Sequence, residues 1–146
     1  MIAYIVTGSI GLIMDIRKGR HVVYSLHVHL VFVTIYRRGV FKAEHLEYMR
    51  EIFESICADF ECQLSEFNGE SDHVHLLIHY PPKVQLSKLV NSLKGVSSRR
   101  LTQKFGRLHR WYYKGALWSP SYFAGSVGGA PISVLKQYIE QQNCPA

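Results

Sequence analysis

The feature that most constrains the fold is a pair of β-forming segments that carry the same four residues, His-Val-His-Leu, starting at His27 and at His73. Both lie in runs of β-branched, aromatic and other apolar residues, which predict strands at 21–34 and 73–80. Two prolines stop the second strand. Because residues i and i+2 of a strand point to the same face, each segment presents two imidazoles side by side.

The period of the apolar residues predicts the other elements. Helical spacing after residues 44 and 86 indicates two amphipathic helices, the second interrupted at Gly95 and capped anew by Ser97 or Ser98. A proline at 131 suits the first turn of a last helix. After the first strand, the expected elements are helix 44–60, strand 62–68, strand 73–80, a broken helix from 86 to 105, strand 122–127 and a C-terminal helix of about 131–142.

This order, β-α-β-β-α-β with a trailing helix, predicts an α+β fold of the ferredoxin-like (split β-α-β) type. The sheet is antiparallel, its first and third strands are neighbours, and two helices pack on one face. A length of 146 residues suits one domain. We expect residues 1–13 to be a non-essential leader and 14–146 to form that domain, with Gly128-Gly129 as a hinge before the C-terminal helix.

Basic residues dominate the second half of the chain. The net charge is +6, yet no Asp or Glu occurs between His73 and Ile139. A region of one sign attracts polyanions, and nucleic acid is the partner that this distribution favours. One aromatic residue of this region, Trp118, could equally well pack in the core. The residues that we expect to contact DNA phosphates or bases are Arg99, Arg100, Lys104, Arg107, Arg110 and Trp118.

Cysteine usage and hydropathy limit the compartment. Three cysteines at no metal-ligand spacing argue against a disulfide scaffold or a zinc site and suit the reducing cytoplasm. The apolar segment 1–14 is shorter than the roughly 20 residues of a membrane span, and it lacks the basic start of a secretory signal. We therefore expect a cytoplasmic protein without a membrane partner.

Paired imidazoles can chelate a divalent ion, although a single pair considered alone is more often satisfied by hydrogen bonds on a sheet. The two copies differ in context. Asp72 directly precedes His73 and His75, and an acid there can orient or supplement a metal shell. His27 and His29 lie among apolar residues. We predict that His73 and His75 are metal ligands and that His27 and His29 are sheet residues able to touch DNA.

The last expected helix carries two further chemical groups. Tyr138 and Gln142 are four residues apart and therefore share a helix face. The amide oxygen of Gln142 is a hard ligand suited to Mg²⁺ or Mn²⁺, and a tyrosine phenol can attack phosphorus. A packed tyrosine and a solvated helix end explain this spacing equally well when nothing else is considered.

Five segments, taken in order, resemble the small single-tyrosine transposases of the HUH class, which act on single-stranded DNA and are encoded by compact bacterial and archaeal insertion sequences. The resemblance covers nearly everything from Met14 onward. The matching segments are YSLHVHLVFVTIYRR (24–38), DHVHLLI (72–78), LKGVSSRRL (93–101), LWSPSYF (117–123) and QYIEQQ (137–142).

The resemblance implies a role for each candidate residue. Tyr138 is the nucleophile that forms a 5′-phosphotyrosine, and His73, His75 and Gln142 hold the divalent metal. It also implies hairpin-bearing element ends as substrates and an obligate homodimer, in which the last helix of one chain completes the active site of the other. No family counterpart precedes Met14.

Two other functions remain open. One is a domesticated relative that acts on repeated hairpins in a host genome, and the other is a non-catalytic nucleic-acid-binding sheet module. Nucleotide hydrolases of the histidine-triad type are disfavoured, because Leu77 occupies the position of their third alternating histidine.

Overall fold

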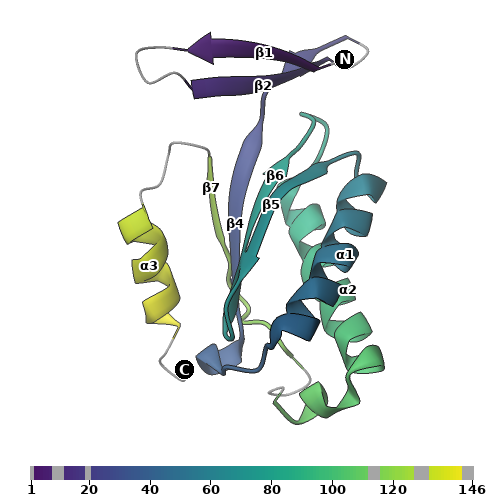
Figure 1. The fold of residues 1–146 in the computed structure, drawn as a ribbon, viewed down its shortest axis with the longest axis vertical. Coiled ribbons are helices and arrows are strands. Elements are labelled where there is room, and N and C mark those ends of the chain that lie inside the picture. Colours follow the sequence, from purple (N-terminus) through teal and green to yellow (C-terminus); the bar gives the residue numbers. More distant parts are fainter. Residues whose placement is uncertain (1, 8–11, 19–20, 112–115, 127–131, 143–146) are drawn as a thin grey trace.

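The computed structural model describes residues 2–7, 12–18, 21–111, 116–126 and 132–142. A four-stranded antiparallel sheet forms its centre (Figure 1), and the strand order is β5-β6-β4-β7. The expected neighbours, the strands around the two His-Val-His-Leu segments, are indeed adjacent. The strands of this sheet are β4 (His27–Val33), β5 (Gln63–Gly69), β6 (His73–His79) and β7 (Phe123–Ser126).

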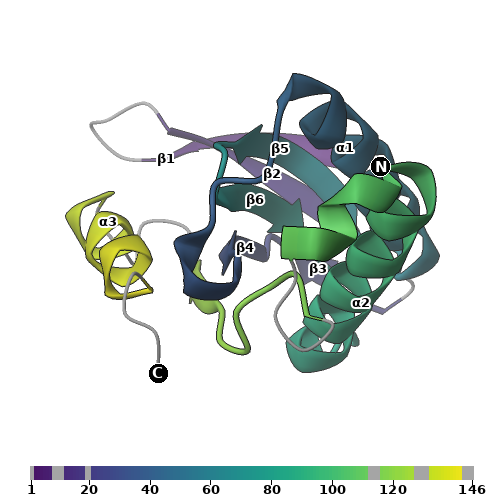
Figure 2. The same cartoon turned by 90° about the horizontal axis from the view of Figure 1, so that it is seen from below.

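Three helices flank this sheet on two sides. The helices α1 (Ala43–Asp59) and α2 (Leu86–Lys104) pack on one face, whereas α3 (Ile132–Gln141) lies on the other side (Figures 1 and 2). The predicted α+β, ferredoxin-like arrangement with a C-terminal helix is therefore confirmed. None of the helices in the described ranges is long and apolar enough to cross a membrane.

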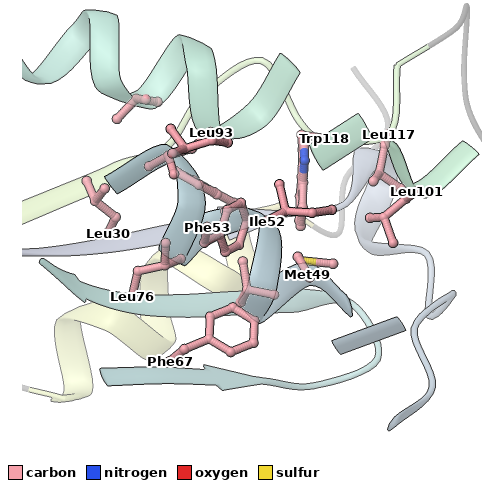
Figure 3. Packing of buried hydrophobic residues seen from close by; sticks show 14 of the residues in the cluster. Leu30, Met49, Ile52, Phe53, Phe67, Leu76, Leu93, Leu101, Leu117 and Trp118 are labelled. Atoms are coloured by element: carbon pink, nitrogen blue, oxygen red, sulfur yellow. The ribbon is translucent and has the colours of Figure 1, made fainter. Parts of the chain in front are cut away.

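Alternation along β4 and β6 divides their side chains between two faces. Val28, Leu30 and Phe32 on β4 are buried against α1 and α2, and so are the even-numbered residues of β6, such as Leu76. Figure 3 shows this core packed between the sheet and the helices, with Phe53 of α1 and Leu93 of α2 among its residues. Burying each large apolar side chain contributes about 1.5–3 kcal/mol, so this face supplies most of the stability.

The predicted interruption at Gly95 is wrong. One continuous helix runs from Leu86 to Lys104, and Ser97 lies within it instead of capping a second piece. A helical glycine costs about 1 kcal/mol relative to alanine. That cost is outweighed because Leu93 and Leu101, on either side of it, are completely buried in the core.

The N-terminal region adds a second, three-stranded antiparallel sheet of β1 (Ile2–Thr7), β2 (Leu12–Lys18) and β3 (Val23–Tyr24). The single strand expected at 21–34 is thus divided between β3 and β4. The expected leader, 1–13, contains β1 and the start of β2, and its dispensability stays a prediction. The expected hinge at Gly128-Gly129 lies outside the described residues.

Candidate active site

Histidines from both central strands gather on the sheet face opposite α1 and α2. The antiparallel register pairs His27 with His79 and Val33 with His73, and directly paired residues share a face. The histidines that this alternation brings to this second face, called the open face below, are His27, His29, His73 and His75, which are half-buried, and His79, which is buried.

His73 is oriented by its neighbour Asp72. The Nδ1 atom of His73 lies 2.8 Å from Asp72 Oδ1, and Arg37 Nε donates to Asp72 Oδ2 at 2.7 Å. Burial alone would raise the pKa of Asp72, but the hydrogen bonds from Arg37 and His73 lower it, so the carboxylate is ionised at neutral pH. An ionised carboxylate only accepts hydrogen bonds, so Nδ1 carries the proton and Nε2 is the available ligand atom of His73.

Arg37 reaches Asp72 through an unusual turn. The 3₁₀ turn Ile35–Arg37 follows β4, and Tyr36 and Arg37 both adopt left-handed backbone angles, with φ of 55° and 56°. Such angles are uncommon for residues other than glycine. Thr34 Oγ1 closes the turn by donating to the carbonyl oxygens of Arg38, at 2.7 Å, and of Asp72, at 3.1 Å. The sequence did not predict this contact.

His75 contacts a histidine of the other copy of the motif. Its Nε2 lies 2.9 Å from His29 Nδ1, and the two rings are stacked with centroids 5.0 Å apart. Burial, followed by the nearby His29, lowers the pKa of His75 and favours its neutral form. His29 was predicted as a sheet residue able to touch DNA, and its observed contact is with His75. The pairing register could have suggested it, because His29 and His75 are diagonal neighbours.

Tyr138 and Gln142 come together as their spacing predicted. Tyr138 Oη lies 2.9 Å from Ser121 Oγ, and its ring packs on Phe123 with centroids 5.9 Å apart. Gln142 Oε1 accepts hydrogen bonds from Ser119 Oγ at 3.0 Å and from Ser121 Oγ at 3.4 Å. Burial raises the pKa of the Tyr138 phenol, and the hydrogen bond with Ser121 opposes part of that rise.

The tyrosine helix and the histidine pair lie on the same side of the sheet. Phe123 and His75 both pair with Val31 and so belong to one row across three strands. Neighbouring strands are about 4.8 Å apart, which separates the Cα atoms of Phe123 and His75 by roughly 10 Å. Because Tyr138 packs on Phe123, it lies near the histidines on this side of the sheet.

The predicted metal ligands are only partly brought together. The orientation of His73 by Asp72 suits a divalent metal, and so does the neutral imidazole of His75. Gln142 instead bonds to Ser119 and Ser121. Within the described ranges, no hydrogen bond joins Gln142 to either histidine, and no three His, Cys, Asp or Glu side chains are grouped as metal ligands.

The predicted DNA-binding residues lie on the helix side of the protein. Arg99, Lys104 and Arg107 are exposed, on or just after α2, and Arg100 is half-buried there. The Lys104 ammonium lies 4.2 Å from the centre of the Tyr48 ring, so an aromatic surface accompanies the charge. Next to it is a cavity of about 420 Å³ whose lining includes Lys104 and Arg107. The side chain of Arg110 is not among those described.

Base stacking by Trp118 is excluded by its burial. The ring is 5% exposed and packs against Phe32 and Phe41, and its Nε1 donates to Ser97 Oγ at 3.0 Å. Figure 3 shows it among the core side chains. Core packing is therefore the correct one of the two interpretations that the sequence left open, because a tryptophan between basic and aromatic neighbours has the same sequence pattern whether it faces solvent or the core.

The fold and the site together define a class. A split β-α-β sheet, with an oriented histidine pair on a central strand and a tyrosine on a C-terminal helix over the same face, is the arrangement of the single-tyrosine HUH transposases. Residues 22–142 match the family described as "Transposase IS200 like". The chain belongs to this family of DNA transposases.

Individual relatives agree with this assignment. The chain is 32% identical to the ISDra2 transposase TnpA of Deinococcus radiodurans over 130 residues, 89% of this chain and 93% of that protein. It is 30% identical to the transposase for insertion sequence element IS200 of Salmonella typhimurium over 128 residues, covering 88% and 84%.

Solved structures give the same result for the fold. A crystal structure of a Deinococcus radiodurans R1 transposase superposes with a TM-score of 0.82 at 33% identity, covering 88% of this chain and 99% of that one. A REP-associated tyrosine transposase bound to a REP hairpin has a TM-score of 0.53 at 12% identity, covering 85% and 68%. The second likeness shows the fold alone.

Proposed function

We propose that this transposase cleaves and rejoins single-stranded DNA at insertion-sequence ends through a covalent 5′-phosphotyrosine on Tyr138. The observation that carries the proposal is the row His75–Val31–Phe123, which puts the tyrosine helix and the histidine pair over one sheet face. A purely nucleic-acid-binding module leaves both the Asp72–His73 pair and Tyr138 without a role.

The chemistry begins with the Tyr138 hydroxyl. Its oxygen attacks one phosphodiester phosphorus and loses its proton, a bond forms between the tyrosine and the 5′-phosphate, and the 3′-oxygen leaves and takes up a proton. The 3′-hydroxyl of a second strand then attacks the phosphotyrosine and restores Tyr138. Each step exchanges one phosphate ester for another, so joining needs no ATP.

His73, His75 and Gln142 are the residues that would hold Mg²⁺ or Mn²⁺. When bound, such an ion polarises the scissile phosphate and offsets negative charge on its oxygens. Asp72 presents Nε2 of His73, whereas His75 must give up its hydrogen bond with His29. Gln142 must likewise give up its hydrogen bonds with Ser119 and Ser121 before its amide oxygen can bind a metal.

DNA bound by this transposase meets two surfaces. The exposed Arg99, Lys104 and Arg107 contact phosphates on the helix side, and the open face contacts the strand to be cut. Hairpin-bearing element ends supply both kinds of DNA, because their duplex stems and single strands are joined.

The test is covalent capture. The protein is incubated with Mg²⁺ or Mn²⁺ and end-labelled single-stranded DNA from the sequences that flank its gene, and adducts are resolved on a denaturing gel. We expect an adduct from the wild-type chain that is lost in Tyr138→Phe and in His73→Ala. Tyr80→Phe is the matched control and keeps the adduct. Binding with no adduct under either metal sinks the proposal.

We further propose that the active protein is a homodimer whose sites are shared, so that each Tyr138 serves the histidines of its partner. Mixing two inactive variants tests this. In a mixed dimer of Tyr138→Phe and His73→Ala, one shared site contains both an intact tyrosine and an intact histidine pair. Recovered adduct formation supports sharing. If each site uses one chain alone, the mixture stays as inactive as its components.

A further inference from the structure

The segment that contacts Tyr138 and Gln142 forms a large irregular bulge in the sheet. Val31 pairs with Phe123 and Thr34 bridges to Trp118, so two residues of one chain segment, 32 and 33, oppose four of the other, 119–122. A bulge leaves backbone groups outside the ladder and turns side chains in new directions. Here it directs the hydroxyls of Ser119 and Ser121 toward α3.

A single ammonium group binds the carbonyl oxygens of this bulge. Lys94 Nζ, from α2, donates to the carbonyl oxygens of Ser119 at 2.7 Å, of Pro120 at 3.3 Å and of Ser121 at 3.2 Å. Lysine has three N–H donors and no acceptor, so these three consecutive carbonyls match its full donor capacity. Its Nζ also lies 5.9 Å from the centre of the Phe32 ring.

Lys94 is half-buried, whereas Lys88 and Lys104, the other lysines of α2, are exposed. Burial lowers the pKa of Lys94, and the three carbonyl oxygens act in the opposite direction by favouring its charged form. A second contact holds the same two segments together, because Ser97 Oγ accepts from Trp118 Nε1 at 3.0 Å and donates to the Lys94 carbonyl oxygen at 3.1 Å. Hydrogen bonds with α2 therefore reach three of the four residues of the bulge and the tryptophan before it.

We propose that Lys94 is a positioning residue of the active site, whose ammonium fixes the Ser119–Ser121 bulge and through it the placement of Tyr138. Lys94 comes from the helix side of the sheet and acts on α3, which lies on the other side (Figure 2). It touches no reacting atom. The role assigned to it rests on the proposed function of Tyr138.

The main test measures the tyrosine itself. Protein labelled with ¹³C at tyrosine Cζ gives a resonance for Tyr138, which Tyr138→Phe identifies by its loss. We expect Lys94→Met, which keeps the aliphatic stem and removes the charge, to shift that resonance. Lys88→Met removes an exposed lysine from the same helix and leaves the resonance in place. An unmoved Tyr138 resonance in folded Lys94→Met overturns the proposal.

The kinetic test separates positioning from DNA binding. In Lys94→Met we expect adduct formation at saturating DNA to slow by about 10- to 100-fold, as small misplacements of reacting groups do. The Kd for single-stranded DNA stays within about twofold, because Lys94 makes no phosphate contact in this scheme. Lys94→Arg, which retains the charge, falls between Lys94→Met and wild type. Weaker DNA binding with an unchanged saturated rate contradicts the proposed role.

A double-mutant comparison tests the route. When Ser119 and Ser121 are both alanine, Lys94→Met should have no further effect on adduct formation, and an undiminished effect refutes action through the bulge. Should Lys94→Met fail to fold, Lys94→Arg decides, since its planar head cannot reproduce three ammonium bonds and must shift the Tyr138 resonance. The resonance is measurable even if no chain forms an adduct, so failure of the proposed function stays distinguishable.

Discussion

The two faces of the central sheet are built from the same strands and have opposite chemistry. Along β6, Leu76 is completely buried under α1 and α2, whereas its neighbour His75 faces the open side beside His29. Two adjacent residues of one strand therefore serve different ends: Leu76 stabilises the fold, and His75 belongs to the candidate site. Because side chains alternate between the faces, a substitution on one face can change the stability, or on the other face the chemistry, with little effect on the other property.

The two faces also differ in their charged groups. The exposed cations Lys104 and Arg107 stand on the helix side, and the oriented His73 stands on the open side. Neutral or hydrogen-bonded imidazoles bind anions weakly, whereas exposed ammonium and guanidinium groups bind them well. We infer that affinity for DNA comes mainly from the helix side and cleavage from the open side.

The largest expected effect compares the neighbours Leu76 and His75. Leu76→Ala should lower the free energy of unfolding by about 2–5 kcal/mol, because it opens a cavity in the core. His75→Ala removes a half-buried side chain with one hydrogen bond, and should lower it by about 1 kcal/mol. Urea denaturation measures both. Equal losses would show that the open face contributes as much to stability as the face under α1 and α2.

The two variants should rank in the opposite order by their effect on adduct formation. His75→Ala loses the adduct although it remains folded, and Leu76→Ala retains it at temperatures where the variant is native. Val74→Ala, also at a completely buried position of β6, serves as a second core control. An adduct that survives in His75→Ala removes His75 from the site.

Local patterns predicted the strands of the central sheet and its helices, but not the N-terminal sheet β1–β3. Period-two alternation around His73 and the i, i+4 spacing of Tyr138 and Gln142 are properties of one segment, and both were visible in the sequence. Trp118 was ambiguous because its environment depends on distant segments. The helix break predicted at Gly95 was wrong because burial of Leu101 in the core outweighed the low helix propensity of glycine.

The contacts that organise the site were not predictable in the same way. The contact between His29 and His75 depends on the strand register, and that between Arg37 and Asp72 depends on a left-handed turn that its residues rarely adopt. Lys94 reaches the site from the opposite layer. Each joins segments far apart in the chain, so only three-dimensional packing reveals them.

A smaller effect is expected from the support of His73. Asp72→Asn keeps the size of the side chain and removes the charge that fixes the imidazole tautomer, which should weaken Mn²⁺ binding by about 10- to 100-fold. Titration calorimetry with Mn²⁺ measures this. Asp59→Asn, an exposed position at the end of α1, removes the same charge and should leave the affinity unchanged. Equal affinity in wild type and Asp72→Asn would mean that His73 needs no orientation.

The smallest expected effect concerns the helix side. Lys104→Gln should reduce the slope of log affinity against log salt by about 0.7, the value for one phosphate contact of a single strand. The matched control is Lys83→Gln, because Lys83 is exposed but already forms an ion pair with Glu61. Fluorescence anisotropy of labelled single-stranded DNA over a salt series measures both slopes.

The same variant tests whether the faces act separately. At saturating DNA, Lys104→Gln should form the adduct at the wild-type rate, because Lys104 is on the helix side and the reacting groups are on the open side. Conversely, His75→Ala should leave the salt slope unchanged. If Lys104→Gln slows the saturated rate as strongly as it weakens binding, the cation acts in the cleavage step as well. The sheet would then not separate affinity from chemistry, and DNA would have to contact both faces at once during cleavage.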